Sequence, residues 1–168
     1  MATNKILIAL NQSPLSLKVL PSVEQLFSTD SSELILYYVT KPPGAAGFGE
    51  PDLSAGYQPL PGDQNVLPTL HPIYESQQRD SIKSHVKTEL MPVTQRLREA
   101  GYKVEVKVGF NKDPVDAIKR YTRETNASLI AMSTMGRVGV TRFFFRNMAN
   151  TLAQEADIPV LLVHPREE

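Results

Sequence analysis

The stretch SLIAMSTMGRVGVTRFFFRNMANTLAQ, residues 128–154, is a strand pattern that breaks near a glycine and continues as a helical pattern. It contains three arginines and no acidic residue. Nucleotide phosphates are often bound where a strand meets the N-terminus of a helix, because free backbone N–H groups and the helix dipole favour an anion there. The stretch therefore predicts an α/β fold with a candidate phosphate site, if the remaining chain supplies a parallel sheet.

Other segments supply the strands of such a sheet. KILIAL (5–10) and ELILYYV (33–39) are almost continuously apolar, which indicates parallel strands covered on both faces. YKVEVKV (102–108) alternates apolar and charged residues and predicts a strand with one solvated face, near the sheet edge. SLIAMS (128–133) and PVLLV (159–163) complete a set of five strands.

The segments between these strands have helical spacing. Ser13 and Asp113 each precede a proline, which is the order of a helix cap and a first helical residue. Further helical patterns cover residues 76–100, which Gly101 would end, and a region near 147–155. Because strands and helices alternate, the order predicts a three-layer α/β/α domain with a five-stranded, mostly parallel, Rossmann-like sheet. Loops after residues 10, 39 and 132 would share its carboxyl edge.

Residues 41–72 interrupt this pattern. They hold seven of the 13 prolines and five of the nine glycines of the chain, with no sustained periodicity. We expect a long insertion loop here rather than a second domain, so that residues 1–168 form one domain. The functional alternative for this loop is a lid or a partner-binding arm.

The overall composition limits the classes of partner. Lys plus Arg (18) equals Asp plus Glu (18), so there is no electrostatic reason to expect nucleic acid or an anionic membrane as partner. There is no cysteine, which suits a reducing compartment. The N-terminal apolar run is shorter than the roughly 7–15 residues of a signal-peptide core and the about 20 residues of a membrane span. We therefore expect a cytoplasmic protein.

Both ends of the chain resemble one known family. KILIALNQSP (5–14) is similar to the first strand and turn of universal stress proteins, where hydrophobic-Ala-hydrophobic-Asp-Gly-Ser is usual. IAMSTMGRVGVTRFFFRNMANTLAQEADIPVLLVHP (130–165) resembles their C-terminal signature more closely. The resemblance covers nearly the whole chain apart from residues 41–72. It implies a fold like that of the adenine nucleotide α-hydrolases, and a homodimer that pairs through the last strand, residues 159–163.

Family members with a nucleotide site carry Gly-x-x-Gly-x9-Gly-Ser/Thr around the phosphates and ribose of ATP. One register aligns this pattern with Ser133, Gly136, Arg146 and Asn147. The other register aligns it with Gly136, Gly139, Ala149 and Asn150. We prefer the first, because the family's first glycine directly follows the strand, and because Asn147 would then cap the last helix.

In the preferred register, one of three glycines remains. Arg146 would cost about 1–2 kcal/mol if its position required a positive φ, and its stem would obstruct a backbone–phosphate contact. A guanidinium is also a good phosphate ligand, so obstruction and a changed ligand are both open. Asn11 replaces the family's Asp, and Gln12 the following Gly; Asn11 keeps an acceptor for ribose or adenine but loses a charge that could help to hold Mg²⁺.

The resemblance therefore implies a degenerate site for ATP or a related adenine nucleotide at the carboxyl edge of the sheet, with Mg²⁺ undecided. The residues expected to bind the nucleotide are Ala9, Leu10, Asn11, Val39, Met132, Ser133, Met135, Gly136, Arg137, Gly139, Arg146, Asn147 and Met148.

Several residues near this site have a structural as well as a functional interpretation. Arg137, Arg142 and Arg146 would form an anion-binding rim or be merely solvated. The aromatic run 143–145 could stack on a base, but core or dimer packing is the better interpretation.

The sequence shows no sign of a catalytic or metal site. The three histidines (71, 85 and 164) lie far apart without a carboxylate pattern, and residues 127–153 contain no Asp, Glu or His. We therefore expect a binding or signalling protein rather than an enzyme, leaving weak ATPase activity open. The alternative is a nucleotide-free, dimeric interaction module.

Overall fold

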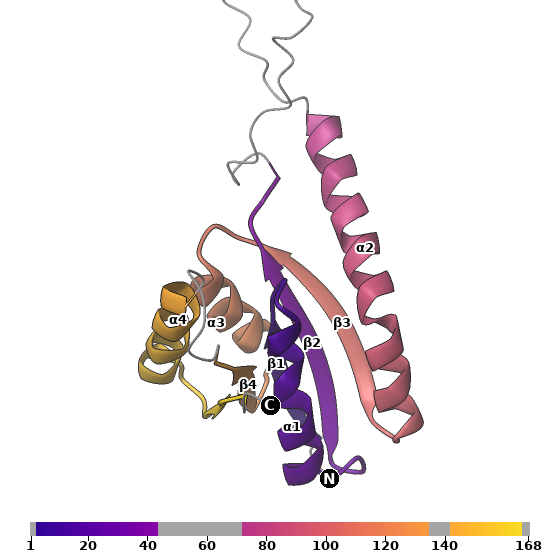
Figure 1. Cartoon of the computed structure of the whole chain (residues 1–168), viewed down its shortest axis with the longest axis vertical. Coiled ribbons are helices and arrows are strands. Elements are labelled where there is room, and N and C mark those ends of the chain that lie inside the picture. Colours follow the sequence, from indigo (N-terminus) through magenta and orange to yellow (C-terminus); the bar gives the residue numbers. More distant parts are fainter. Residues whose placement is uncertain (1–2, 44–71, 135–141, 166–168) are drawn as a thin grey trace, which may run out of the picture.

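The computed structural model describes residues 3–43, 72–134 and 142–165. Strands and helices alternate through these residues (Figure 1). In chain order the elements are β1 (Asn4–Leu10), the 3-10 helix η1 (Pro14–Val19), α1 (Leu20–Leu26), β2 (Ser32–Thr40), α2 (Pro72–Glu99), β3 (Lys103–Phe110), α3 (Pro114–Thr125), β4 (Leu129–Ser133), α4 (Arg142–Glu155) and β5 (Val160–Val163).

The five strands form one sheet in the order β3-β2-β1-β4-β5, and every neighbouring pair is parallel. The predicted five-stranded, Rossmann-like sheet is therefore confirmed. The chain first adds β2 and β3 on one side of β1, and then crosses to add β4 and β5 on the other side. Right-handed crossovers in these two directions place their helices on opposite faces of the sheet.

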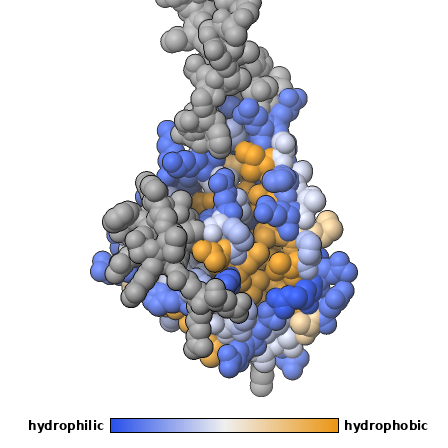
Figure 2. Space-filling model, in the orientation of Figure 1, coloured by the Kyte–Doolittle hydropathy of each residue, from blue (hydrophilic) through white to orange (hydrophobic). Residues whose placement is uncertain are grey.

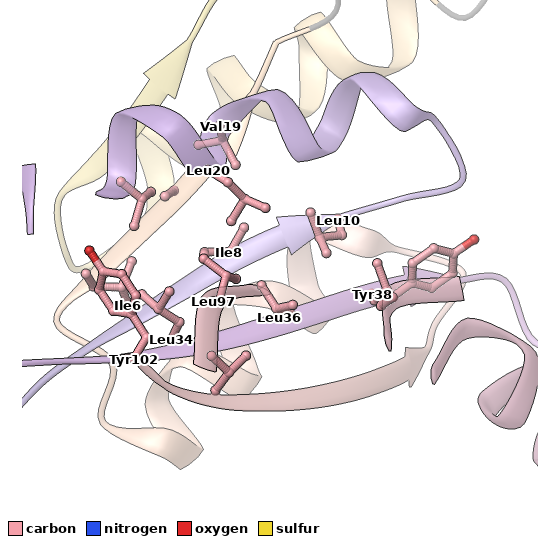
Figure 3. Packing of buried hydrophobic residues seen from close by; sticks show 14 of the residues in the cluster. Ile6, Ile8, Leu10, Val19, Leu20, Leu34, Leu36, Tyr38, Leu97 and Tyr102 are labelled. Carbon is pink, nitrogen blue, oxygen red and sulfur yellow. The ribbon is translucent and has the colours of Figure 1, made fainter. Parts of the chain in front are cut away.

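Two apolar clusters hold the helices to the two faces. Along β1, Ile6, Ile8 and Leu10 belong to the cluster under η1, α1 and α2 (Figure 3), whereas Leu7 and Ala9 belong to the cluster under α3 and α4. This alternation confirms the prediction that the first strand is covered on both faces. On the first of these faces, Figure 2 shows hydrophobic residues in the strip between α1 and α2, with hydrophilic residues beside them.

Local signals set several helix ends as predicted. The Ser13 hydroxyl accepts a hydrogen bond from the N–H of Leu15 at 3.3 Å and caps η1. A carboxylate oxygen of Asp113 accepts from the N–H of Val115 at 2.9 Å and caps α3. Gly101 follows α2 with a φ of +104°, a backbone conformation that residues with a Cβ atom rarely adopt.

Three helix boundaries differ from the prediction. The first helical segment is divided into η1 and α1, and Pro21 lies in the first turn of α1, where the missing N–H is not needed. For the same reason α2 begins at Pro72, ahead of residue 76. The last helix begins at Arg142 rather than near Asn147. The prediction missed this start because the aromatic residues of the first turn have a low helix propensity.

The predicted insertion over residues 41–72 lies almost wholly outside the described residues. Its last residue, Pro72, opens α2, which extends beyond the sheet at the carboxyl edge (Figure 1). Neither α2 nor another helix in the described ranges contains an apolar window long enough to cross a membrane.

The two edges of the sheet differ in chemistry. On β3, the side chains of Lys103, Glu105 and Lys107 are exposed, as predicted for a strand with one solvated face. The guanidinium of Arg98 donates a hydrogen bond to the carbonyl oxygen of Val104 at 2.9 Å, which occupies a main-chain group of this edge strand. On β5 all four residues are apolar and partly buried. Charge protects one edge of the sheet, whereas the other edge is suited to pairing.

Candidate functional site

The two central strands separate at their carboxyl ends. The register between β1 and β4 ends at Ile8 and Ala131. In contrast, the β1–β2 register continues to Leu10, and the β4–β5 register continues to Ser133, the last residue of each central strand. The last two residues of β1 and of β4 therefore lie beyond their shared ladder. We call this end of the β1–β4 ladder the opening between β1 and β4. It is at the point where strand order reverses, and ligands of open α/β sheets bind at such points.

Strand alternation distributes the predicted site residues over two faces. Ala9 and Met132 are buried in the cluster under α3 and α4, and Val39 packs against the same cluster. Leu10 is buried in the cluster on the other face. The structure therefore brings Ala9, Val39 and Met132 together as an apolar floor beside the opening, and does not place Leu10 with them.

The turn after β1 is held by hydrogen bonds of its own side chains. Asn11 Oδ1 accepts a hydrogen bond from the N–H of Ser13 at 2.6 Å. The buried hydroxyl of Ser16 donates to the carbonyl oxygen of Ser13 at 2.8 Å and lies 3.4 Å from that of Asn11. The amide oxygen predicted to accept from a ligand therefore already accepts one hydrogen bond from the main chain of the turn, which leaves one lone pair for a ligand. Sequence reasoning missed Ser16, whose only signal was its place in the first turn of the helix.

At the end of β4, Ser133 carries a polar atom without a partner. Its side chain is 5% exposed, and its hydroxyl makes no hydrogen bond within the described part of the chain. A buried hydroxyl without a partner is costly, so a ligand or water that bonds to it would be stabilised. Among the predicted site residues that the structure describes, Ser133 therefore has a buried hydroxyl that is available to bond a ligand.

Thr134 and His164 join the ends of β4 and β5. The N–H of Thr134 donates to the carbonyl oxygen of Val163 at 2.8 Å, and its hydroxyl is hydrogen-bonded to Nδ1 of His164. Sequence reasoning gave neither residue a role at the site, because no short-range pattern links positions thirty residues apart. From the sequence we expected no metal site at His164 or at the other two histidines. Among the described residues, no three or more His, Cys, Asp or Glu side chains are arranged to hold a metal ion.

Four residues of the predicted phosphate site lie outside the described residues: Met135, Gly136, Arg137 and Gly139. Met148 is partly buried and packs against the cluster under α3 and α4.

The position of α4 corrects the capping argument for the preferred register and the strain considered for Arg146. Asn147 lies inside α4, so it is not the cap of that helix. Arg146 is helical as well, so the strain expected at a positive φ is absent. The other register aligns Ala149 with a phosphate-binding glycine, yet Ala149 is buried against the sheet. The capping argument therefore no longer favours the preferred register, and its remaining argument rests on Ser133, the last residue of β4.

An aromatic pair lies behind the apolar floor. Tyr37 is the register partner of Ala9, and its ring stacks on that of Tyr121 from α3 with centroids 4.4 Å apart. Burial raises the pKa of both phenols, that of Tyr121 to about 12. Both rings are therefore neutral at physiological pH and act here by packing.

A shallow pocket of about 170 Å³ lies at the opposite edge of the sheet, between the C-terminal ends of α3 and α4. Its two cations are paired, Lys119 with Glu155 at 2.9 Å and Arg123 with Asp157 at 2.8 Å. Because the pocket is at the amino ends of the strands, it is separate from the opening between β1 and β4. It is lined by Lys119, Thr122, Arg123, Asn126, Ala127, Ile130, Ala156, Asp157 and Ile158.

Comparison with known proteins agrees with this architecture. The model of the universal stress protein family matches residues 2–164. The chain belongs to the universal stress protein family. Comparison with curated proteins gave no match. The resemblance seen at the two ends of the sequence is therefore confirmed, and it includes both strands that form the opening.

Solved structures share the fold of this family member. A hypothetical protein whose biochemical function was assigned from its structure is 16% identical, with a TM-score of 0.67 and 100% of both chains covered. A universal stress protein in complex with cAMP is 18% identical, with a TM-score of 0.58 and 98% of both chains covered. An Arabidopsis thaliana family member with AMP bound is 15% identical, with a TM-score of 0.56, covering 97% of this chain and 92% of that one.

Proposed function

We propose that this universal stress protein binds an adenine nucleotide in the opening between β1 and β4, and that it acts as a binding or signalling protein rather than an enzyme. The observation that carries the proposal is the early end of the β1–β4 ladder at Ile8 and Ala131. It leaves an opening at the switch point of a parallel sheet, where nucleotides bind in this class of fold. The cAMP and AMP complexes of two structural neighbours support an adenine nucleotide as the ligand.

The residues at the opening suit the two ends of such a ligand. The apolar floor of Ala9, Val39 and Met132 suits a base, and the unpartnered hydroxyl of Ser133 suits a polar ribose or phosphate oxygen. We place the phosphates toward the first turns of α4, because the sequence supplies Arg142 and Arg146 there and Arg137 shortly before them. The N-terminus of α4 adds a partial positive charge on that side.

We also propose a homodimer through β5. This strand is at the end of the sheet and is apolar throughout, whereas the opposite edge strand carries exposed charges. An apolar edge left open would favour aggregation, and pairing with a second copy removes that edge. A chain without cysteine suits a reducing compartment, so we propose a cytoplasmic location.

The nucleotide proposal is tested on freshly purified protein. The protein is denatured, and the released small molecules are identified by mass spectrometry; calorimetry with AMP, cAMP and ATP, with and without Mg²⁺, then measures affinity. We expect Asn11→Ala to weaken binding and Asn4→Ala to leave it unchanged, because Asn4 is exposed at the opposite end of the same strand. No released nucleotide together with no calorimetric binding would favour a nucleotide-free interaction module.

A further inference from the structure

The end of β4 continues its ladder with β5 after its ladder with β1 has stopped. The register of β4 with β1 ends at Ala131, whereas the register with β5 continues to Ser133, which pairs with Val163. The attachment to β5 extends one residue further, because the N–H of Thr134 donates to the carbonyl oxygen of Val163 at 2.8 Å. The position of Ser133 beside the opening therefore depends on how firmly this end of β4 is attached to β5.

A bond between two side chains completes this attachment. Thr134 is buried, and its hydroxyl is hydrogen-bonded to Nδ1 of His164, the residue that directly follows β5. The carbonyl oxygen of Val163 lies 3.4 Å from the same hydroxyl, which is longer than a usual O–H···O hydrogen bond. The imidazole is therefore the closer partner of this hydroxyl. His164 itself is exposed, so its ring is not needed to fill the core.

We propose that His164 is a positioning residue for the candidate site. By bonding the hydroxyl of Thr134, it fixes the end of β4. It thereby fixes the adjacent Ser133, whose buried hydroxyl has no partner in the described part of the chain. A group that is already held in place loses less conformational entropy when a ligand binds to it, so the affinity is higher. The inference rests on the proposed function, because it requires a nucleotide that bonds to Ser133.

Three substitutions test the bond from both of its sides. His164→Ala removes it, whereas His164→Asn retains a polar atom near the position of Nδ1, because both side chains carry their first polar atom on Cγ and an amide can donate and accept. Thr134→Val removes the hydroxyl and keeps the branched shape of the side chain. His85→Ala is the matched control, because His85 is exposed on α2. The probe is whichever of AMP, cAMP and ATP binds wild type most tightly in calorimetry.

We expect His164→Ala to bind this probe about fivefold more weakly than wild type, and both His164→Asn and His85→Ala to stay within about twofold of wild type. Thr134→Val should lose the same factor as His164→Ala. The double variant should lose no more than either single variant, because both changes remove the same bond. In a Ser133→Ala background, His164→Ala should have no further effect, since the hydroxyl that the bond positions is gone.

A purely structural role of His164 would give a different result. It predicts that His164→Ala lowers the free energy of unfolding in urea and leaves the affinity for the probe unchanged, and this result would overturn the inference. Equal weakening by His164→Ala and His164→Asn would also overturn it, because the retained bond would then have no effect. A fivefold loss that persists in the Ser133→Ala background would show that His164 does not act through Ser133.

The failure of the proposed function would be recognised separately. If wild type binds none of the three nucleotides, the proposed function fails and the inference fails with it. If wild type binds a nucleotide and only the effects of His164 and Thr134 are missing, the proposed function stands and the inference is overturned. Circular dichroism and thermal unfolding confirm that each variant is folded.

Discussion

Tyr37 of β2 lies directly over Gly109 of β3. A Cβ placed on Gly109 would be 2.7 Å from Cζ of the tyrosine ring, closer than real Cβ contacts come. The same ring stacks on Tyr121 of α3, with an angle of 19° between the ring planes. The small residue on the edge strand therefore gives Tyr37 the space that it needs to hold α3 against the sheet behind the candidate site.

We expect Gly109→Ala to lower the free energy of unfolding by about 1–3 kcal/mol, because the added methyl group displaces the Tyr37 ring. Urea denaturation measures this change. In a Tyr37→Phe background the penalty should be smaller, since the hydroxyl nearest the new methyl group is gone. Lys107→Ala, exposed on the same face of β3, is the matched control and should change stability by less than about 0.5 kcal/mol. A stability of Gly109→Ala equal to that of wild type would contradict this packing.

Alkaline pH should destabilise the fold through its tyrosines. Burial, with smaller contributions from Glu105, Tyr37 and Glu124, raises the pKa of Tyr121 from 10.0 to about 12. Because the folded state binds this proton more tightly, its contribution to stability is complete below pH 10 and is lost as pH rises through 12. We expect a fall in the free energy of unfolding over this range, and a shallower fall for Tyr121→Phe. Urea titrations at several pH values measure the free energy of unfolding. The same dependence of this free energy on pH in wild type and in Tyr121→Phe would contradict the prediction.

Ser133→Ala should separate ligand binding from stability. Removing a buried hydroxyl without a partner should leave the free energy of unfolding unchanged or raise it by up to about 1 kcal/mol. If the hydroxyl donates to the nucleotide, affinity should fall about fivefold. Ser32→Ala is the matched control, because the hydroxyl of Ser32 is also buried without a partner in the described ranges. Ser32 begins β2, so it lies at the amino ends of the strands, opposite the candidate site. Unchanged nucleotide affinity in Ser133→Ala would remove Ser133 from the site.

A charge on β5 should prevent dimerisation. Leu161→Lys places an ammonium in the apolar edge strand, and we expect a monomer or insoluble protein in place of the dimer proposed for wild type. Glu105→Lys on β3 changes charge at the opposite edge and should leave the oligomeric state unchanged. Analytical ultracentrifugation at micromolar concentration distinguishes these outcomes, and a monomeric wild type would be the finding against the proposal.

Much of the fold could be predicted from the sequence, because its signals are local. The apolar run 5–10 identified β1, and the Asp113–Pro114 and Gly101 signals identified helix ends that the structure confirms. The start of α4 could not be predicted in the same way. Its first turn is rich in aromatic residues, which have no strong helical preference, and the prediction near Asn147 was wrong.

The candidate site could be predicted only in part. The sequence and its family resemblance placed Ala9, Asn11 and Ser133 at one edge of a parallel sheet. They could not show that Asn11 Oδ1 is engaged by Ser13, since this depends on the conformation of the turn. They also could not show that the β1–β4 ladder ends at Ile8 and Ala131, which depends on how two strands distant in sequence diverge.

The sequence by itself determined the elements, their alternation and the family, because caps, apolar periodicity and motifs act over a few neighbouring residues. The tertiary structure alone decided the opening between β1 and β4, the contact of Tyr37 with Gly109 and the bond of Thr134 with His164. Each of these joins residues that are far apart in the sequence. Their geometry depends on the packing of the whole sheet against its helices, which no local pattern encodes.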